Sequence, residues 1–219
     1  MGLIPVRPPV RSGGARRAAI AALAAVLLFS GCTPLKRFAY EGFGRDGWQK
    51  PDEVIAALAL RPGDRVADIG SGSGYFSFRL ARAVGASGRV YAVDVDRAMN
   101  EDLAERAREA GLANIEVVDA RADDPMLPET GVDLLFVSDA YHHIGDRVRY
   151  FSNAAKTLRP GGRLAVVDFD GRGWFERTIG HTTPPEVIKK EMEQAGYRLE
   201  REFDFLERQS FLVFSRQAP

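Results

Sequence analysis

Three acidic residues occupy similar positions in the sequence, each at the end of a short hydrophobic segment. They are Asp68, Asp94 and Asp119, and the loop Gly70-Ser71-Gly72-Ser73-Gly74 follows the first of them closely. Glycine residues let a backbone turn sharply and let a ligand come close to it. Carboxylates attract cations and accept hydrogen bonds from hydroxyl and amino groups. The combination predicts a site for a ligand that carries a positive charge, hydroxyl groups and an amino group.

The residues around the glycine loop argue against the common phosphate sites. The loop lacks the Gly-Lys-Ser/Thr sequence of a triphosphate site, and its spacing differs from the G-x-G-x-x-G of dinucleotide sites. Asp68 lies two residues before Gly70, where it would repel a pyrophosphate but attract an ammonium or sulfonium group. Asp94 lies 20 residues after Gly74, where an acid can accept both hydroxyls of a ribose, and Asp119 is placed for an exocyclic amino group. The alternative interpretation is a packing turn that binds no ligand.

The three acids can share one site if their strands run parallel, because the carboxyl ends of parallel strands lie at one edge of a sheet. The patterns predict strands at Arg65–Ile69, Arg89–Asp94, Ile115–Val118, Val132–Val137 and Arg163–Phe169. They predict helices at Asp52–Leu60, Tyr75–Val84, Met99–Ala110, Asp146–Leu158 and Pro184–Ala195. Two further segments, Arg198–Leu206 and Gln209–Ser215, indicate a C-terminal hairpin. The lead-in Thr33–Lys50 has no clear period, and we expect it to be irregular.

At these positions the sequence resembles the class I S-adenosylmethionine-dependent methyltransferases, from about Gly47 to Ser215. The family's first motif resembles Asp68-Ile69-Gly70-Ser71-Gly72-Ser73-Gly74, its second strand resembles Tyr91-Ala92-Val93-Asp94, and its third resembles Asp119-Ala120. The family's fourth strand resembles Asp133-Leu134-Leu135-Phe136-Val137-Ser138-Asp139. The turn before its fifth strand resembles Leu158-Arg159-Pro160-Gly161-Gly162-Arg163-Leu164. The resemblance implies an α/β, Rossmann-like fold. Its seven-stranded, mostly parallel sheet would have the order 3-2-1-4-5-7-6, with helices on both faces and a C-terminal antiparallel hairpin.

The resemblance also implies S-adenosyl-L-methionine as the cofactor. The residues expected to bind it are Asp68, Gly70, Ser71, Gly72, Gly74, Tyr75, Asp94, Val95, Asp119 and Ala120. Two other functions stay open at this point. One is an exported binding or scaffold lipoprotein that keeps the fold without turnover, and the other is a nicotinamide-dependent oxidoreductase, which Asp68 and the glycine spacing disfavour.

Methyl transfer from a sulfonium is an in-line displacement, so most of the catalysis can come from holding the reacting atoms in line. A general base is needed only if the acceptor must lose a proton. The candidates are Asp139, His142 and His143, which follow the fourth strand. The alternative is that one histidine packs under the following helix while the other is solvated. One cysteine and three histidines, with no two-His-one-carboxylate spacing, lead us to expect no metal.

The charge balance bears on the kind of acceptor. Thirty basic residues balance thirty acidic ones, and the sequence has no lysine-arginine cluster, which argues against a nucleic-acid substrate. We expect a small-molecule or lipid-like acceptor. The aromatic residues of the lead-in, Phe38, Tyr40, Phe43 and Trp48, either line its pocket or cover the core.

The first 31 residues resemble a lipoprotein signal peptide. Residues 1–31 contain four arginines and no acid, and the apolar run Ala18–Phe29 is 12 residues long, whereas a membrane-spanning helix needs about 20. The following Leu28-Phe29-Ser30-Gly31-Cys32 resembles a lipobox, although Phe29 replaces the usual aliphatic residue. A buried amphipathic helix is the alternative.

We therefore expect residues 1–31 to be a signal peptide, 32–50 a tether and entrance segment, and 51–219 the methyltransferase domain. Lipidation of Cys32 would anchor the protein in the cell envelope, at the periplasm-facing outer membrane of a Gram-negative cell. If the leader is a wrongly assigned start, the enzyme is cytoplasmic.

Overall fold

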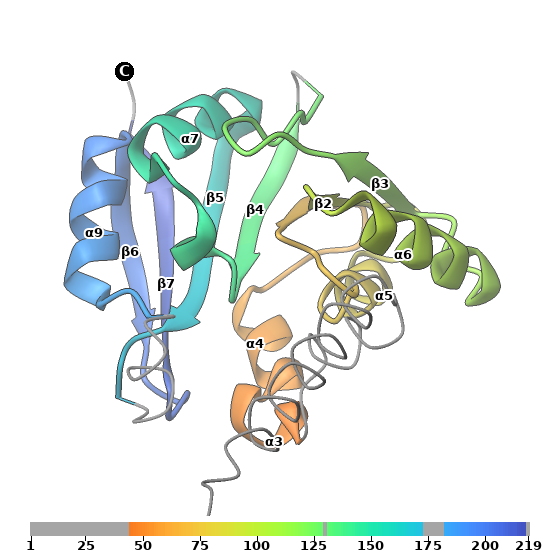
Figure 1. The fold of residues 1–219 in the computed structure, drawn as a ribbon, viewed down its shortest axis with the longest axis horizontal. Coiled ribbons are helices and arrows are strands. Elements are labelled where there is room, and N and C mark those ends of the chain that lie inside the picture. The colour runs from red at the N-terminus through yellow and green to blue at the C-terminus, as the bar shows by residue number, and fades with distance from the viewer. Residues whose placement is uncertain (1–43, 129–130, 173–181, 218–219) are drawn as a thin grey trace, which may run out of the picture.

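One seven-stranded sheet forms the centre of the structure, which is a computed structural model that describes residues 44–128, 131–172 and 182–217 (Figure 1). Its order, β3-β2-β1-β4-β5-β7-β6, confirms the expected one. The strands are β1 (Arg65–Ile69), β2 (Arg89–Asp94), β3 (Ile115–Asp119), β4 (Val132–Ser138), β5 (Leu158–Phe169), β6 (Tyr197–Phe203) and β7 (Gln209–Arg216). The first five are mutually parallel, and β7 runs antiparallel to β5 and β6.

Helices cover both faces of this sheet (Figure 1). They are α3 (Arg45–Gln49), α4 (Pro51–Ala57), α5 (Ser77–Val84), α6 (Arg97–Glu109), α7 (Arg147–Ala154) and α9 (Pro185–Gln194), with short 3₁₀ turns at η1 (Tyr141–His143) and η2 (Ala155–Thr157). Successive strand residues point to opposite faces, so Ala67 joins the core beneath α7 and α9 while Val66 joins the core beneath α4 and α5. All seven residues of β4 are buried, as expected for a central strand covered on both sides.

The boundaries of several elements differ from the sequence prediction for local reasons. Helix α6 begins at Arg97, two residues early, because the Asp96 carboxylate accepts hydrogen bonds from the backbone N–H groups of Ala98 and Met99. Helix α5 begins at Ser77 rather than Tyr75. Helix α7 ends at Ala154 rather than Leu158, and the chain then tightens into η2.

The lead-in was expected to be irregular up to Lys50, and this expectation is wrong for its last residues. Arg45–Gln49 form α3, which precedes α4 directly, with Lys50 in a left-handed conformation between them. The lipobox cysteine Cys32, the rest of the expected signal peptide and residues 32–43 lie outside the described residues. Within the described ranges, no helix is both long enough and apolar enough to cross a membrane.

Candidate functional site

The glycine loop after β1 crosses the carboxyl edge of the sheet. The backbone N–H groups of Gly70 and Ser71 donate to the carbonyl of Val93, at 2.8 and 3.1 Å, and so hold the loop against β2. Gly70 has a φ of 75°, and a Cβ atom there would collide with the Cβ of Ala140 in the loop after β4. This position requires glycine, because the loops after β1 and β4 meet there.

A cavity of about 880 Å³ opens beside this loop, a volume typical of sites for small organic ligands. Eleven of the thirteen residues expected to bind the cofactor or perform chemistry line it: Asp68, Gly70, Ser71, Gly72, Tyr75, Asp94, Val95, Ala120, Asp139, His142 and His143. Gly74 and Asp119 are not among the lining residues. The fold therefore brings together residues from the ends of four strands.

Asp94 and Asp119 end neighbouring strands but have different surroundings. The Asp94 carboxylate accepts hydrogen bonds from the backbone N–H of Gly72, at 2.8 Å, and of Asp96, at 2.9 Å, and so joins the glycine loop to the end of β2. Asp119 is exposed and accepts a hydrogen bond from Asn100 Nδ2 at 2.7 Å. Its carboxylate thus stabilises α6 against β3, a contact that strand-end position alone did not indicate.

Asp68 lies buried beneath the loop at the end of β1. Its Oδ2 accepts a hydrogen bond from Ser77 Oγ at 2.6 Å. Burial raises the pKa of Asp68 from 3.8 to about 7; the Ser77 hydrogen bond opposes this rise, and the nearby negative charge of Asp94 adds to it. A cationic ligand at this point would favour the charged carboxylate.

Two buried hydroxyl groups in the loop offer a test of whether the expected cofactor fits. Among the described residues, Ser71 Oγ and Ser73 Oγ have no hydrogen-bond partner, although buried polar atoms nearly always have one. Ser71 lines the cavity beside Asp68 and Asp94. An aminocarboxypropyl sulfonium joined to a ribose presents the positive charges, the carboxylate and the hydroxyls that these groups can bind. S-Adenosyl-L-methionine therefore fits the residues that line this cavity.

Asp139 follows β4 and lies at the centre of a network that sequence reasoning did not predict. Its carboxylate accepts hydrogen bonds from Arg45 Nη2 at 2.6 Å, from Gln49 Nε2 at 3.0 Å, and from Gln209 Nε2. Burial raises the pKa of Asp139, while the Arg45 cation and the Gln49 amide oppose the rise. Helix α3 and strand β7 are thereby joined to the end of β4.

His142, which lines the cavity, is hydrogen-bonded to the buried Asp168. His142 Nδ1 lies 2.8 Å from Asp168 Oδ1. Asp168, on β5, is completely buried, and among the described residues its Oδ2 has no partner. His143 is exposed, and the centroids of the two imidazole rings are 4.1 Å apart. Sequence reasoning missed Asp168, although an acid within the hydrophobic run Val166-Val167-Asp168-Phe169 was the available signal.

Aromatic side chains also line the cavity. Trp48 of α3 and Phe169 of β5 have ring centroids 5.5 Å apart, and both line the cavity, as do Ile144 and Tyr150. Trp48 is thus a pocket residue, whereas Phe38, Tyr40 and Phe43 lie outside the described residues. No group of three metal-ligating side chains occurs in the part of the chain that the structure describes.

Comparison with known proteins gives a consistent result. The model of a family described as "Methyltransferase domain" matches residues 60–204. The ubiquinone/menaquinone biosynthesis C-methyltransferase UbiE of Francisella philomiragia is 31% identical over 123 residues, which are 56% of this chain and 48% of that protein. This chain therefore spans about half the length of the curated relatives it matches.

Solved structures of other proteins have a fold similar to that of this chain. A SAM-dependent methyltransferase from Aquifex aeolicus superposes with a TM-score of 0.75 at 24% identity, over 83% of this chain and 97% of the other. A protein from Bordetella parapertussis described as a possible exported protein gives a TM-score of 0.61 at 18% identity, over 78% and 68% of the two chains.

Proposed function

This chain belongs to the family of class I S-adenosylmethionine-dependent methyltransferases, and we propose that it methylates a carbon atom of a small, apolar, quinol-like ring. The observation that carries this proposal is that His142, which lines the cavity together with aromatic side chains, is hydrogen-bonded to the buried Asp168. The relatives named as ubiquinone/menaquinone biosynthesis C-methyltransferases support the same class of acceptor.

S-Adenosyl-L-methionine supplies a methyl group on a sulfonium, from which it is displaced in line by a nucleophile. The residues that would hold it are Asp68 and Ser71 at its amino-acid end and Asp94 at its ribose. The glycines of the loop let the ligand come close to its backbone, and the two carboxylates and the Ser71 hydroxyl would orient it. In this proposal the chain contributes positioning and proton transfer.

Methylation of a quinol carbon releases one proton overall. The ring hydroxyl loses its proton as the new C–C bond forms and the S–C bond breaks, and the proton on the methylated carbon then leaves while the ring oxygen regains one. Asp168 lies at His142 Nδ1, which favours the tautomer whose proton is on Nδ1 and leaves Nε2 as the basic atom. His142 Nε2 would take the hydroxyl proton, and the buried carboxylate of Asp168 would stabilise the resulting imidazolium.

The walls of the cavity suit a flat ring. Trp48 and Phe169 stand close together, and Ile144 and Tyr150 add apolar surface. Aromatic side chains pack well against a ring in offset or edge-to-face arrangements. The volume of the cavity, about 880 Å³, is also large enough for a cofactor and a small acceptor side by side.

The test measures transfer of a labelled methyl group from S-adenosylmethionine to 1,4-naphthoquinol, to catechol and to a dihexanoyl phospholipid. We expect transfer to the naphthoquinol, with the product methylated at carbon. His142→Gln and Asp168→Asn should each lower kcat by 10²–10⁴-fold, the usual contribution of a general base. The control is His143→Gln, which alters the exposed neighbour and should retain most of the activity. Equal losses in both histidine variants, or transfer to the phospholipid alone, would contradict the proposal.

We also propose that the enzyme is anchored at the cell envelope through Cys32, with residues 32–50 as the link to the domain. The basic start, the 12-residue apolar run and the residues before Cys32 support this location. The experiment is labelling with a palmitate analogue, followed by fractionation, of the wild type and Cys32→Ser. Label in the membrane fraction of the wild type alone is the expected result, and a soluble chain that retains Met1 would refute the anchor.

A further inference from the structure

A charged side chain outside the cavity is joined to the turn that carries His142. Glu191 lies on α9, and its side chain is 21% exposed. Its Oε2 accepts a hydrogen bond from Tyr141 Oη at 2.6 Å, and Tyr141 directly precedes His142 in η1. Neither Glu191 nor Tyr141 is among the described residues that line the cavity. The mechanism proposed above uses neither of them.

Arg147 fixes the position of the Glu191 carboxylate. It is the first residue of α7, and its Nε and Nη2 donate to the two carboxylate oxygens at 2.8 and 2.9 Å. Such a two-point contact between a guanidinium and a carboxylate sets the orientation of both groups. Burial alone would raise the pKa of Glu191, but the hydrogen bonds from Arg147 and Tyr141 lower it below its usual value. Glu191 is therefore charged at neutral pH, and we call Tyr141, Arg147 and Glu191 the tyrosine clamp.

The turn η1 depends on contacts outside itself. It is a single 3₁₀ turn of three residues. The backbone N–H of His143 donates to Ala140 at 3.0 Å, and that of Ile144 donates to Tyr141 at 3.2 Å. Short 3₁₀ segments have poorer hydrogen-bond geometry than α-helices. Side-chain contacts with neighbouring elements therefore decide where this turn lies.

Tyr141 and His142 hold η1 from two directions. The Tyr141 side chain is completely buried, and its ring is stacked on that of Phe151 of α7 with the centroids 5.6 Å apart. The His142 side chain is 7% exposed and contacts Asp168 of β5 through Nδ1. Because a rigid peptide unit joins the two residues, a displacement of Tyr141 also displaces His142. The tyrosine clamp and the hydrogen bond to Asp168 are thus coupled through η1.

We propose that Glu191 is a positioning residue, which acts through Tyr141 to hold the imidazole of His142 in the geometry that proton transfer needs. Its effect on the rate rests on the proposed function, in which His142 is the base. Its effect on the hydrogen bond between His142 and Asp168 does not, because that bond can be observed without acceptor or cofactor. A displacement of about 1 Å at a reacting group can lower a rate about a hundredfold.

The experiment uses the full-length chain labelled with ¹⁵N-histidine, in a neutral detergent. The sequence contains three histidines, and His142→Gln identifies the resonances of His142. NMR measures the rate at which the proton on His142 Nδ1 exchanges with water, which reports how often the hydrogen bond to Asp168 opens. The test variants are Tyr141→Phe, which removes one hydroxyl and keeps the stacked ring, and Glu191→Ala, which removes the acceptor of that hydroxyl.

The matched control is Tyr197→Phe. Tyr197, on β6, is completely buried in the same core as Tyr141, and its Oη donates to the carbonyl of Phe151 at 3.0 Å. The substitution therefore removes one buried tyrosine hydrogen bond without touching η1. The free energy of unfolding in urea, measured for every variant, separates a loss of stability from a loss of positioning.

We expect the Nδ1 proton to exchange at least tenfold faster in Tyr141→Phe and Glu191→Ala than in the wild type, because both break a hydrogen bond to a charged group. With 1,4-naphthoquinol as acceptor, both variants should lower kcat at least tenfold, while their affinity for S-adenosylhomocysteine stays within twofold of the wild type. Tyr197→Phe should leave proton exchange and kcat within twofold of the wild type.

The outcomes separate this inference from the proposed function. Equal changes in Tyr141→Phe and Tyr197→Phe would show that the Tyr141 hydroxyl contributes stability alone, and unchanged proton exchange in Tyr141→Phe and Glu191→Ala would show that Glu191 does not position His142. Either result would overturn the inference. A wild type that transfers no methyl group to the naphthoquinol, but whose proton exchange rises in both test variants, would refute the proposed function and support the positioning role.

Discussion

The pKa of Asp68 makes cofactor binding depend on pH in a calculable way. In the structure burial raises this pKa to about 7, so near pH 6 the side chain is mostly protonated. If the sulfonium and ammonium groups of S-adenosylmethionine lie beside Asp68, they stabilise the carboxylate and lower its pKa to below about 5. Binding then releases the proton, and the affinity rises with pH until Asp68 is ionised in the free protein.

The size of the effect follows from the raised pKa of Asp68. About 0.9 of Asp68 is protonated at pH 6 and about 0.25 at pH 7.5, so the affinity should increase about eightfold between these values, or about 1.3 kcal/mol. The range stops at pH 7.5 because the α-amino group of the ligand loses its own charge near pH 8. Calorimetry at pH 6 in buffers with different ionisation enthalpies should find about 0.9 proton released per ligand bound.

The control is Asp68→Asn, whose amide oxygen can still accept the hydrogen bond from Ser77 but does not titrate. We expect this variant to bind more weakly at pH 7.5 and to release no proton at pH 6. The stability of the free protein gives an independent check. Because the folded pKa of Asp68 is raised, its protonated form contributes stability that is present in full below about pH 4 and lost as the pH rises through 7. Proton release that is the same in Asp68→Asn would falsify the assignment of the cation-binding group.

Three other substitutions test the site and its supports. Asp94→Ala should weaken adenosylmethionine binding by about 1–3 kcal/mol, measured by calorimetry, because it removes the acceptor proposed for the ribose hydroxyls; an unchanged affinity would contradict that role. Gly72→Val should abolish binding while circular dichroism shows an intact fold, since Gly72 has a φ of 49° and lines the cavity; normal binding would mean that the loop is only a turn. Arg45→Gln should lower the free energy of unfolding in urea by about 2 kcal/mol, because it removes the cation from the largely buried Asp139. The control Arg97→Gln breaks an exposed pair and should lower it by about 0.5 kcal/mol or less. Equal losses would show that the Arg45–Asp139 contact stabilises the fold no more than an exposed ion pair does.

Much of the fold could be predicted from the sequence because each strand of the sheet is a local pattern. Strands β1 and β2 have the bounds that the hydrophobic segments indicated, and the sheet has the order that the family resemblance implied. A strand buried on both faces is a continuous apolar run, which short windows of sequence reveal. Helix starts were less accurate, because a cap such as Asp96 acts through its side-chain geometry rather than through hydrophobic period.

The sequence predicted which residues belong to the candidate site but not what surrounds each of them. Asp68, Asp94 and Asp119 look equivalent in the sequence, since each ends a hydrophobic segment. In the structure the first is buried with a raised pKa, the second accepts hydrogen bonds from two backbone N–H groups, and the third is exposed and bonded to Asn100. Burial and partners separate residues that spacing treats alike.

Contacts between distant parts of the chain had no signal in the sequence at all. Gln209 on β7 and Arg45 on α3 lie 70 and 94 positions from Asp139, yet both donate to its carboxylate. Such a pairing depends on the sheet order, which places β7 beside β5, and on a helix too short to have a recognisable period. For Asp168 the sequence offered a signal, an acid within a hydrophobic run, but it did not indicate the partner His142, which belongs to a different strand-end loop.

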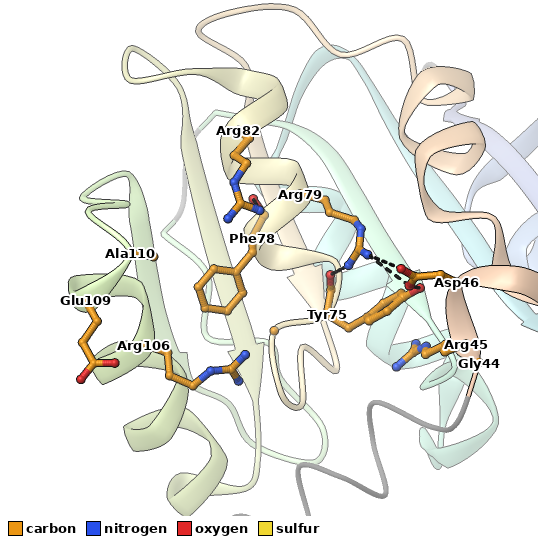
Figure 2. A pocket seen from close by; sticks show the side chains of 11 residues that line it. Gly44, Arg45, Asp46, Tyr75, Phe78, Arg79, Arg82, Arg106, Glu109 and Ala110 are labelled. Carbon is orange, nitrogen blue, oxygen red and sulfur yellow. Dashed lines mark hydrogen bonds and ion pairs between the residues drawn. The ribbon is translucent and has the colours of Figure 1, made fainter.

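Helix α3 supports the wall of the cofactor cavity. Arg45 contacts Asp139 on the cofactor side, and its guanidinium also lies 3.9 Å from the centre of the Tyr75 ring. Tyr75 in turn donates to Asp46, which accepts from Arg79 of α5 (Figure 2). Arg45 and Tyr75 both line the cavity, so the contacts that α3 makes hold two of its wall residues in place.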